Sequence, residues 1–388
     1  MPLVIISSFL LAAGLYITWL VHNRSRLDLV VEPWSSQLGP PQAEKSPLIS
    51  VIIPARNEER NIRRCVEALF SQSYSNFELI VVDDRSSDET GEILSQLQRL
   101  DTRLHLVVGQ EMPPGWAGKP HALVQGVNMA QGEWLCFMDA DTFAGDDLLA
   151  STYKKAIEQN ADMLSILTEQ ELVTFWEKTI LPLVFLGLSF GFPPQRVNDP
   201  CKPDAISNGQ FILVKRRVYD AIGGHAAVKD RVDEDKSLAI LVKRAGFRLL
   251  LADGRKLART RMYTSLPEMW EGWTKNIYLG LADRLGLLLF GAFLGLVVSF
   301  LLPAWLMAGL AWLLGGGGSI AAIITAEAAL LWGYLIWKRH QACRAFGIPG
   351  WYALTFPLGA FIFTLMMAAS AYNVISGRGV TWKGRRYH

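Results

Sequence analysis

The sequence predicts an α/β domain with a doubly wound, mostly parallel sheet, placed between transmembrane helices at the two ends of the chain. Hydrophobic residues make up 51% of the 388 residues, which is more than an ordinary soluble protein contains. This apolar excess is confined to the two ends, and charged residues are spread evenly between them. The middle part alternates short apolar runs with helix-like segments, which is the pattern of a parallel sheet.

The N-terminal segment has no charged side chain over residues 1–21, a length that crosses the apolar core of a bilayer. Arg24 and Arg26 follow directly, and basic residues beside a span favour the cytoplasmic side. We therefore expect a transmembrane anchor at 1–21, a linker over 22–46 and a cytoplasmic α/β domain over 47–283.

A second apolar block, residues 284–375, is expected to form transmembrane helices, and residues 376–388 a basic tail. A proline and a run of glycines divide the block, which indicates one span near 286–308 and another near 319–337. Basic clusters flank residues 350–373 on both sides, and one crossing between them conflicts with the positive-inside rule. Either this segment is a hairpin bent near its proline, or one apolar segment does not cross.

Two further features of the apolar segments each have two interpretations. Glu327 lies inside a predicted span, where an acidic residue either serves a function or faces a partner helix. Residues 179–195 are uncharged but only 17 residues long, which is short for a span. For them we expect a helix in the membrane interface, or a lid over an acceptor site, rather than a crossing.

The α/β domain begins with the apolar run Leu48–Ile53, which predicts a strand buried on both faces. Asn57 is expected to cap the helix that follows, with acidic residues in its first turn. Phe77–Val82 is the second predicted strand, and a capping box at 86–89 is expected to open a helix that ends at Leu100.

The alternation then continues through a strand at Leu104–Val108, a helix at Lys119–Ala130 and a strand at Trp134–Met138. In doubly wound sheets, ligands bind beyond the carboxyl ends of the strands. Pairs of acidic residues stand at two of these ends: Asp83 and Asp84, and Asp139 and Asp141. The edge of the sheet is therefore the predicted site.

Asp139 and Asp141 are two carboxylates placed to share one hard cation such as Mg²⁺ or Mn²⁺, which would neutralise a diphosphate. The alternative without a function is a solvated turn that contains two acidic residues. Asp83 or Asp84 is suited to accept from a nucleobase or a ribose hydroxyl. Lys119 lies among small residues just before a helix, where it contacts a phosphate or simply belongs to a surface turn.

Other function classes are excluded by what the sequence contains. The net charge of +2 gives no case for a nucleic-acid partner. No glycine-rich dinucleotide or P-loop motif follows the first strand.

The three acids at 233–235 precede an apolar helix. Either they stabilise the helix dipole, or one of them acts as a general base.

Five motifs in this order resemble those of the family 2 inverting glycosyltransferases with a GT-A fold, over roughly residues 48–283. They read SVIIPARNE at 50–58, VVDDRSSD at 81–88, DAD at 139–141, SNGQ at 207–210 and DED at 233–235. The resemblance implies a nucleotide-diphospho-sugar transferase domain, a Mg²⁺ or Mn²⁺ cofactor and a nucleotide-sugar donor.

The resemblance also implies roles for individual residues. Asp235 would be the catalytic base, and Asp139 and Asp141 would hold the metal ion. The donor would contact Pro54, Arg56, Glu58, Asp83, Asp84, Lys119 and Asp139. The acceptor side would include Gln210, Glu234 and Trp273.

One departure from the family narrows the expected activity. Processive members carry a Q-x-x-R-W motif, but the corresponding residues 270–276 read WEGWTKN, which favours transfer of a single sugar without processivity. This stretch and the order of membrane segments look like bacterial enzymes that act on carotenoids and hopanoids. The resemblance then implies UDP-glucose as donor, glucose as the sugar, and an integral protein of the bacterial cytoplasmic or thylakoid membrane.

Apolar residues recur at helical spacing over 265–283, which predicts a helix where a lipid or terpenoid acceptor enters from the cytoplasmic leaflet. The alternative is that these aromatic side chains pack only on the sheet. Two other functions stay open. A polyprenyl phosphate acceptor would need little base catalysis, and a membrane protein that binds nucleotide sugars without turnover would need none.

Overall fold

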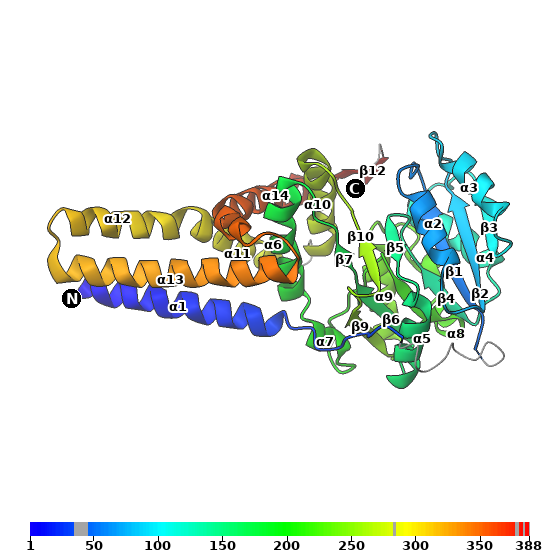
Figure 1. The fold of residues 1–388 in the computed structure, drawn as a ribbon, viewed down its shortest axis with the longest axis horizontal. Helices are drawn as coiled ribbons and strands as arrows, with labels where there is room; N and C mark the ends of the chain where they lie inside the picture. The colour runs from blue at the N-terminus through cyan, green and yellow to red at the C-terminus, as the bar shows by residue number, and fades with distance from the viewer. Residues whose placement is uncertain (35–45, 282–284, 377–379, 383–384, 388) are drawn as a thin grey trace. The chain divides into compact units, whose positions relative to one another are not determined.

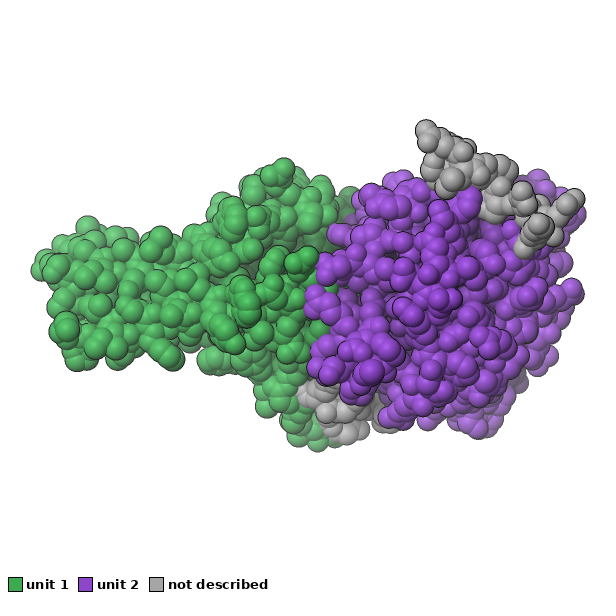
Figure 2. Space-filling model, turned by 90° about the horizontal axis from the view of Figure 1, so that it is seen from below, with its two compact units in different colours: residues 1–26, 172–193, 263–388 green, residues 27–171, 194–262 purple. Residues whose placement is uncertain are grey.

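The computed structural model describes residues 1–34, 46–281, 285–376, 380–382 and 385–387. They form two compact units, coloured separately in Figure 2. The α/β unit comprises residues 27–171 and 194–262. The helical unit comprises residues 1–26, 172–193 and 263–388. The expected domain over 47–283 is therefore divided, and the predicted linker and basic tail lie partly outside the described residues.

The central sheet of the α/β unit confirms the predicted doubly wound, mostly parallel arrangement (Figure 1). Among the described residues it has seven strands in the order β3-β2-β1-β4-β8-β6-β9. Only β8 runs antiparallel to its neighbours, β4 and β6. The strands are β1 (Ile49–Ala55), β2 (Phe77–Asp83), β3 (Leu104–Val108), β4 (Trp134–Phe137), β6 (Met163–Leu167), β8 (Ile212–Lys215) and β9 (Leu249–Asp253).

Helices cover both faces of this sheet because successive residues of a strand point to opposite sides. Val51 and Ile53 belong to the core shared with α2 (Ile62–Phe70) and α3 (Thr90–Gln98). Ile52 faces the other side, where α4 (Gly118–Met129) packs on β1 and β2. Gly126 permits the close approach, since a methyl group there would lie 2.5 Å from Ile52 Cγ2.

The remaining elements complete the α/β unit. A second sheet has the order β5-β10-β7. Residues 29–31 extend along β9, with hydrogen bonds of 2.9 Å from Val31 N to Asp253 O and 2.8 Å from Asp253 N to Leu29 O. The other elements are β5 (Thr142–Ala144), α5 (Leu148–Glu158), β7 (Glu169–Gln170), α7 (Pro194–Asn198), α8 (Arg216–Ala221), the 3-10 helix Gly224–Val228, α9 (Glu234–Arg244) and β10 (Ala258–Thr260).

Two predicted helix starts are wrong, and tertiary contacts explain both. Asn57 caps no helix: it has a φ of 53°, and its side chain accepts a hydrogen bond from Ser87 N at 2.8 Å. The helix begins only at Ile62. Likewise α3 begins at Thr90, whose N–H donates to Asp88 at 3.1 Å, so no capping box opens at 86.

The helical unit gathers segments that are distant in the sequence, including both terminal regions (Figure 1). Its α-helices are α1 (Pro2–Arg24), α6 (Phe175–Gly191), α10 (Leu266–Leu281), α11 (Leu285–Leu296), α12 (Leu302–Leu314), α13 (Gly318–Ala345) and α14 (Phe356–Ser376). A π-helical turn spans Val297–Leu301, a 3-10 helix spans Gly350–Thr355, and β11 (Val380–Trp382) pairs with β12 (Arg385–Tyr387).

Four helices in the described residues are long and apolar enough to cross a membrane: 2–24, 285–314, 318–345 and 350–373. The expected division at Pro303 is absent, because the helix continues through it. In the π-helical turn before the proline, the N–H of Leu302 already bonds to Val297 O. The glycines at 315–318 do separate two helices. The 3-10 helix Gly350–Thr355 continues into α14 at Phe356. This junction is next to Pro357, near which the hairpin alternative placed a bend.

Glu327 of α13 faces a partner helix, which is one of its two predicted interpretations. Its carboxylate accepts hydrogen bonds from the hydroxyl groups of Ser7 and Ser8 in α1, the second at 2.5 Å. Gly14 lets the same two helices approach further along, because a methyl group there would lie 2.7 Å from Leu331. Hydrogen bonds between polar side chains, and a glycine that allows close approach, are both typical of helix–helix contacts in lipid.

The short segment expected over 179–195 forms most of α6, and α6 packs within the helical unit. Pro182 lies inside this helix and removes the N–H that would bond to the carbonyl of Lys178. The buried Arg339 of α13 compensates, with Nη2 donating to Lys178 O at 2.9 Å and to Thr179 O at 3.1 Å. Whether α6 lies in the membrane interface stays a prediction.

The contact between α6 and α14 depends on Gly359, since a methyl group there would lie 2.6 Å from Thr179 O and 3.0 Å from a Leu183 methyl carbon. We expect Gly359→Ala to lower the free energy of unfolding by about 1–3 kcal/mol, because backbone and side chain must move. Thermal unfolding of the detergent-solubilised protein measures this.

The matched control is Gly333→Ala in α13, where a methyl group would meet no atom within 4 Å. Alanine favours a helix over glycine by up to about 1 kcal/mol, so this variant should be unchanged or more stable. Equal stability of the two variants would contradict the close packing of α6 on α14.

Candidate active site

The predicted site residues of the α/β unit come together at the carboxyl ends of β1, β2 and β4. The first turn of α9 and the loop before β8 join them there. This is the place expected for a ligand of a doubly wound sheet. Each group of side chains can be assigned to an element that holds it in position.

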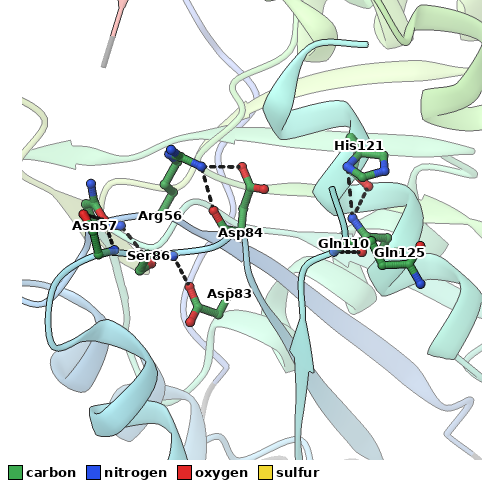
Figure 3. A network of polar contacts seen from close by, with 9 residues as sticks. Arg56, Asn57, Asp83, Asp84, Ser86, Gln110, His121 and Gln125 are labelled. Atoms are coloured by element: carbon green, nitrogen blue, oxygen red, sulfur yellow. Dashed lines mark hydrogen bonds and ion pairs between the residues drawn. The ribbon is translucent and has the colours of Figure 1, made fainter. Parts of the chain in front are cut away.

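Arg56 and Asp84 link the ends of β1 and β2 (Figure 3). Arg56 Nη1 donates to Asp84 O at 2.9 Å and lies 3.7 Å from Asp84 Oδ2. Asp83 turns away from this pair in Figure 3 and accepts from Ser86 N at 3.0 Å. Of the two candidate acids, Asp84 is therefore the one paired with the arginine, and it is buried.

A second polar group lies on the β3–α4 side of the same view and was missed by the sequence analysis (Figure 3). Gln125 Oε1 accepts from Gln110 N at 2.8 Å, and its amide nitrogen lies 3.2 Å from His121 Nδ1. The ring of Trp116 meets His121 edge to face. These contacts anchor the loop that leads to Lys119, and no spacing in the sequence indicates them.

Lys119 brings the central carboxylates together. Its Nζ lies 2.6 Å from Asp139 Oδ1 and 2.7 Å from Glu234 Oε1. Gly209 leaves the room for this, since a methyl group there would lie 2.9 Å from Lys119 Nζ and 3.2 Å from Asp235 Oδ2. The structure thus joins three predicted residues and adds the role of Gly209.

Asp235 is held by backbone donors on both carboxylate oxygens. Oδ2 accepts from Gly209 N at 2.9 Å, and Oδ1 accepts from Lys236 N at 2.7 Å. The hydroxyl of Ser207 donates to the Asp235 carbonyl at 2.6 Å. The carboxylate is therefore fixed between the SNGQ loop and the start of α9, as a positioned base requires.

Burial raises the pKa of Glu234 to about 7, against the attraction of Lys119. Burial also raises the pKa of Asp235, although Lys119 and its two backbone donors act against the rise. For Lys119, Asp139 and the other two carboxylates outweigh desolvation and raise the pKa well above its ordinary value. Lys119 therefore stays charged, and the two acids are more basic than free carboxylates.

Two buried rings, those of Tyr219 and His225, pack on Phe137 of β4. Tyr219 Oη accepts from His225 N at 3.0 Å and lies 3.0 Å from His225 Nδ1. Burial, and then the charge of Lys119, lower the pKa of His225 to about 3. The imidazole is therefore neutral at pH 7. Sequence analysis missed this pair.

The other predicted residues have varied surroundings. Asp233 pairs with Arg231 at 2.9 Å, so it is the helix N-cap acid and no part of the Lys119 cluster. Gln210 is buried and bonds to Thr168 and Asn208. Its acceptor role stays a prediction.

Pro54 lies within β1, opposite Val82 of β2. The backbone N–H of Glu58 donates to Thr90 Oγ1 at 2.8 Å. Trp273 belongs to the helical unit, where its buried ring meets those of Phe185 and Tyr263. The roles of these three residues toward a donor or an acceptor also stay predictions.

A divalent cation is compatible with Asp139 and Asp141. Both side chains are partly exposed beyond β4, and carboxylate oxygens are the ligands that Mg²⁺ and Mn²⁺ prefer. No group of three or more His, Cys, Asp or Glu side chains is clustered as a metal site in the residues that the structure describes. The protein would thus supply two ligands and leave the rest to phosphate and water.

Comparison with known proteins supports the resemblance. The model of the family described as glycosyl transferase family 2 matches residues 50–223. The glycosyltransferase GlyA of Streptococcus pneumoniae is 36% identical over 115 residues, 30% of this chain and 16% of that protein. The 4,4'-diaponeurosporenoate glycosyltransferase of Staphylococcus haemolyticus is 27% identical over 242 residues, 62% of this chain and 63% of that one.

Among solved structures, the mannosyltransferase PcManGT of Pyrobaculum calidifontis, in complex with GDP-Man and Mn²⁺, superposes with a TM-score of 0.56 at 17% identity. The match covers 97% of this chain and 99% of that one, and it shows the GT-A fold of the α/β unit. This chain spans from 16% to 63% of the length of the curated relatives GlyA, GlyG and the staphylococcal enzyme.

Proposed function

We propose that this protein transfers one sugar from a nucleoside-diphosphate sugar to a hydrophobic membrane acceptor, because the model of glycosyl transferase family 2 matches residues 50–223. The observation that carries the proposal is the convergence of Lys119, Asp139, Glu234 and Asp235 at Gly209. It joins a cation suited to a diphosphate with a positioned carboxylate base at the edge of a doubly wound sheet.

The proposed reaction is a single displacement at the sugar C1. Asp235 removes the proton of an acceptor hydroxyl, whose oxygen attacks C1 from the face opposite the diphosphate and inverts that carbon. Lys119 stabilises the charge on the leaving diphosphate. A Mg²⁺ or Mn²⁺ ion on Asp139 and Asp141 would add further neutralisation of that charge. Arg56 and Asp84 are the proposed contacts of the nucleoside, with UDP-glucose the expected donor.

The four long apolar helices support a lipid or terpenoid acceptor, and a relative named for a diaponeurosporenoate supports a carotenoid. That name denotes a carboxylate, which like a polyprenyl phosphate is already anionic and needs little help from a base. A hydroxyl acceptor is favoured here because backbone N–H groups hold both oxygens of Asp235.

The first prediction tests the base. Asp235→Asn keeps the size of the side chain but cannot take a proton, so transfer to a hydroxyl acceptor should fall about 10²–10⁴-fold. Asp233→Asn is the control, because that acid pairs with Arg231 outside the cluster. Mass spectrometry of lipids and pigments from a host expressing each form identifies the product and measures its amount.

Three outcomes of this comparison would redirect the proposal. Normal transfer by Asp235→Asn beside an inactive Glu234→Gln would move the base to Glu234. Normal transfer by both, with Asp233→Asn also active, would favour an anionic acceptor such as a polyprenyl phosphate. Donor binding without any turnover in the wild-type protein would favour a binding protein.

The second prediction concerns the metal. Donor turnover should stop with EDTA and return with Mn²⁺ or Mg²⁺, and Asp139→Ala or Asp141→Ala should each lower it about 10²-fold or more. Release of nucleoside diphosphate from the sugar donor is the measurement. Full activity after exhaustive chelation would exclude the metal from the reaction.

The third prediction concerns orientation. Arg24 ends the first apolar helix and Arg26 follows it, so we propose that the α/β unit faces the cytoplasm. A cysteine introduced at Ser95 on α3 should stay unlabelled when intact cells meet a membrane-impermeant maleimide, and it should react after lysis. Labelling of intact cells would reverse the assignment. The native exposed Cys201 is replaced by serine beforehand.

A further inference from the structure

The active site contains a cation of its own on the carboxylate that is proposed to bind the metal. Lys119 Nζ lies 2.6 Å from Asp139 Oδ1 and 2.7 Å from Glu234 Oε1. Oδ2 of Asp139 faces the same space as the ammonium group. A methyl group added to Gly209 would lie 3.5 Å from Asp139 Oδ2 and 2.9 Å from Lys119 Nζ. An ion on Asp139 would therefore stand close to the ammonium group.

Two cations that share one carboxylate repel each other. The interaction is strong over a few ångströms when the pair is partly shielded from water. The side chains of Lys119 and Asp139 are 33% and 30% exposed, so bulk water screens them only in part. Each cation should therefore weaken the binding of the other to Asp139.

The lysine has a reason to leave Asp139 when a donor binds. A diphosphate brings several negative charges, and Lys119 stands at the start of α4, whose N-terminal end also favours anions. Its side chain is a flexible four-carbon stem with a compact charge, so the ammonium group can move without its helix.

We propose that Lys119 and the divalent cation compete for Asp139, and that the diphosphate of the donor ends the competition by drawing Lys119 to itself. This inference rests on the proposed function, in which Asp139 binds the metal. It makes Lys119 a gate for the cofactor: the ion binds tightly when the nucleotide is bound and only weakly when it is not. It also makes the metal affinity, and not only turnover, depend on this lysine.

Mn²⁺ binding to the full-length protein in detergent tests the proposal, with free Mn²⁺ followed by electron paramagnetic resonance. Without nucleotide, Lys119→Met should bind Mn²⁺ about tenfold more tightly than wild type, because one repulsive charge is removed. With saturating UDP, and in a second series GDP, the advantage should fall to about threefold or less, or reverse, since wild-type Lys119 then pairs with the diphosphate.

Two variants control for charge and for folding. Lys154→Met removes an equal charge from the surface pair with Glu158, at 3.7 Å, and should change Mn²⁺ affinity less than about twofold. Lys119→Arg keeps the charge and should bind Mn²⁺ as weakly as wild type without nucleotide. Circular dichroism and gel filtration check folding, and Lys119→Gln replaces Lys119→Met if the latter misfolds.

Equal or weaker Mn²⁺ binding by Lys119→Met without nucleotide would overturn the competition. Asp139→Asn separates this failure from a failure of the proposed metal site. If Asp139→Asn still binds Mn²⁺ like wild type in the presence of UDP, the metal is not on Asp139 and the proposed site falls with the gate. If it loses binding while Lys119→Met shows no gain, only the gate is wrong.

Discussion

The arrangement of the active site depends on the ion pairs that the ammonium group of Lys119 makes with Asp139 and Glu234. Asp139 follows β4, whereas Glu234 and Asp235 begin α9, and three carboxylates in one place repel one another. Glu234 is buried, and a buried charge without a partner is strongly unfavourable. Lys119 supplies the opposite charge, and Gly209 supplies the space in which it does so.

The fold explains why these groups meet. Parallel strands end at one edge of a sheet, so β4 delivers Asp139 to the edge where its neighbour β1 ends, and where β2, on the other side of β1, ends as well. The antiparallel β8 runs the other way, so the loop before it, with Gly209, reaches the same edge. Asp235 lies in the first turn of α9, where Ser207 and Gly209 anchor it. Elements of opposite direction therefore converge on one place.

Much of the α/β unit follows from the sequence, because strands buried on both faces appear as unbroken apolar runs. Leu104–Val108 is found with its predicted bounds, and the acids after β2 and β4 lie at the expected edge. The pairing of Lys119 with Glu234 was not predictable, since it joins distant segments that no periodicity connects. Asn57 is not a helix cap because its side chain accepts a hydrogen bond from the backbone N–H of Ser87. Local helix propensity cannot predict this contact between two distant segments.

The helical unit has a consequence for how the chain is made. Its first helix, α1, leaves the ribosome long before α13, whose Glu327 accepts from Ser7 and Ser8. Similarly, α6 waits for Arg339 to satisfy the carbonyl that Pro182 leaves without a donor. The whole α/β unit is translated between α1 and α13, whereas only its residues 194–262 are translated between α6 and α13. Both helix contacts can therefore form only once α13 has been made, and a chain that ends before α13 lacks both of them.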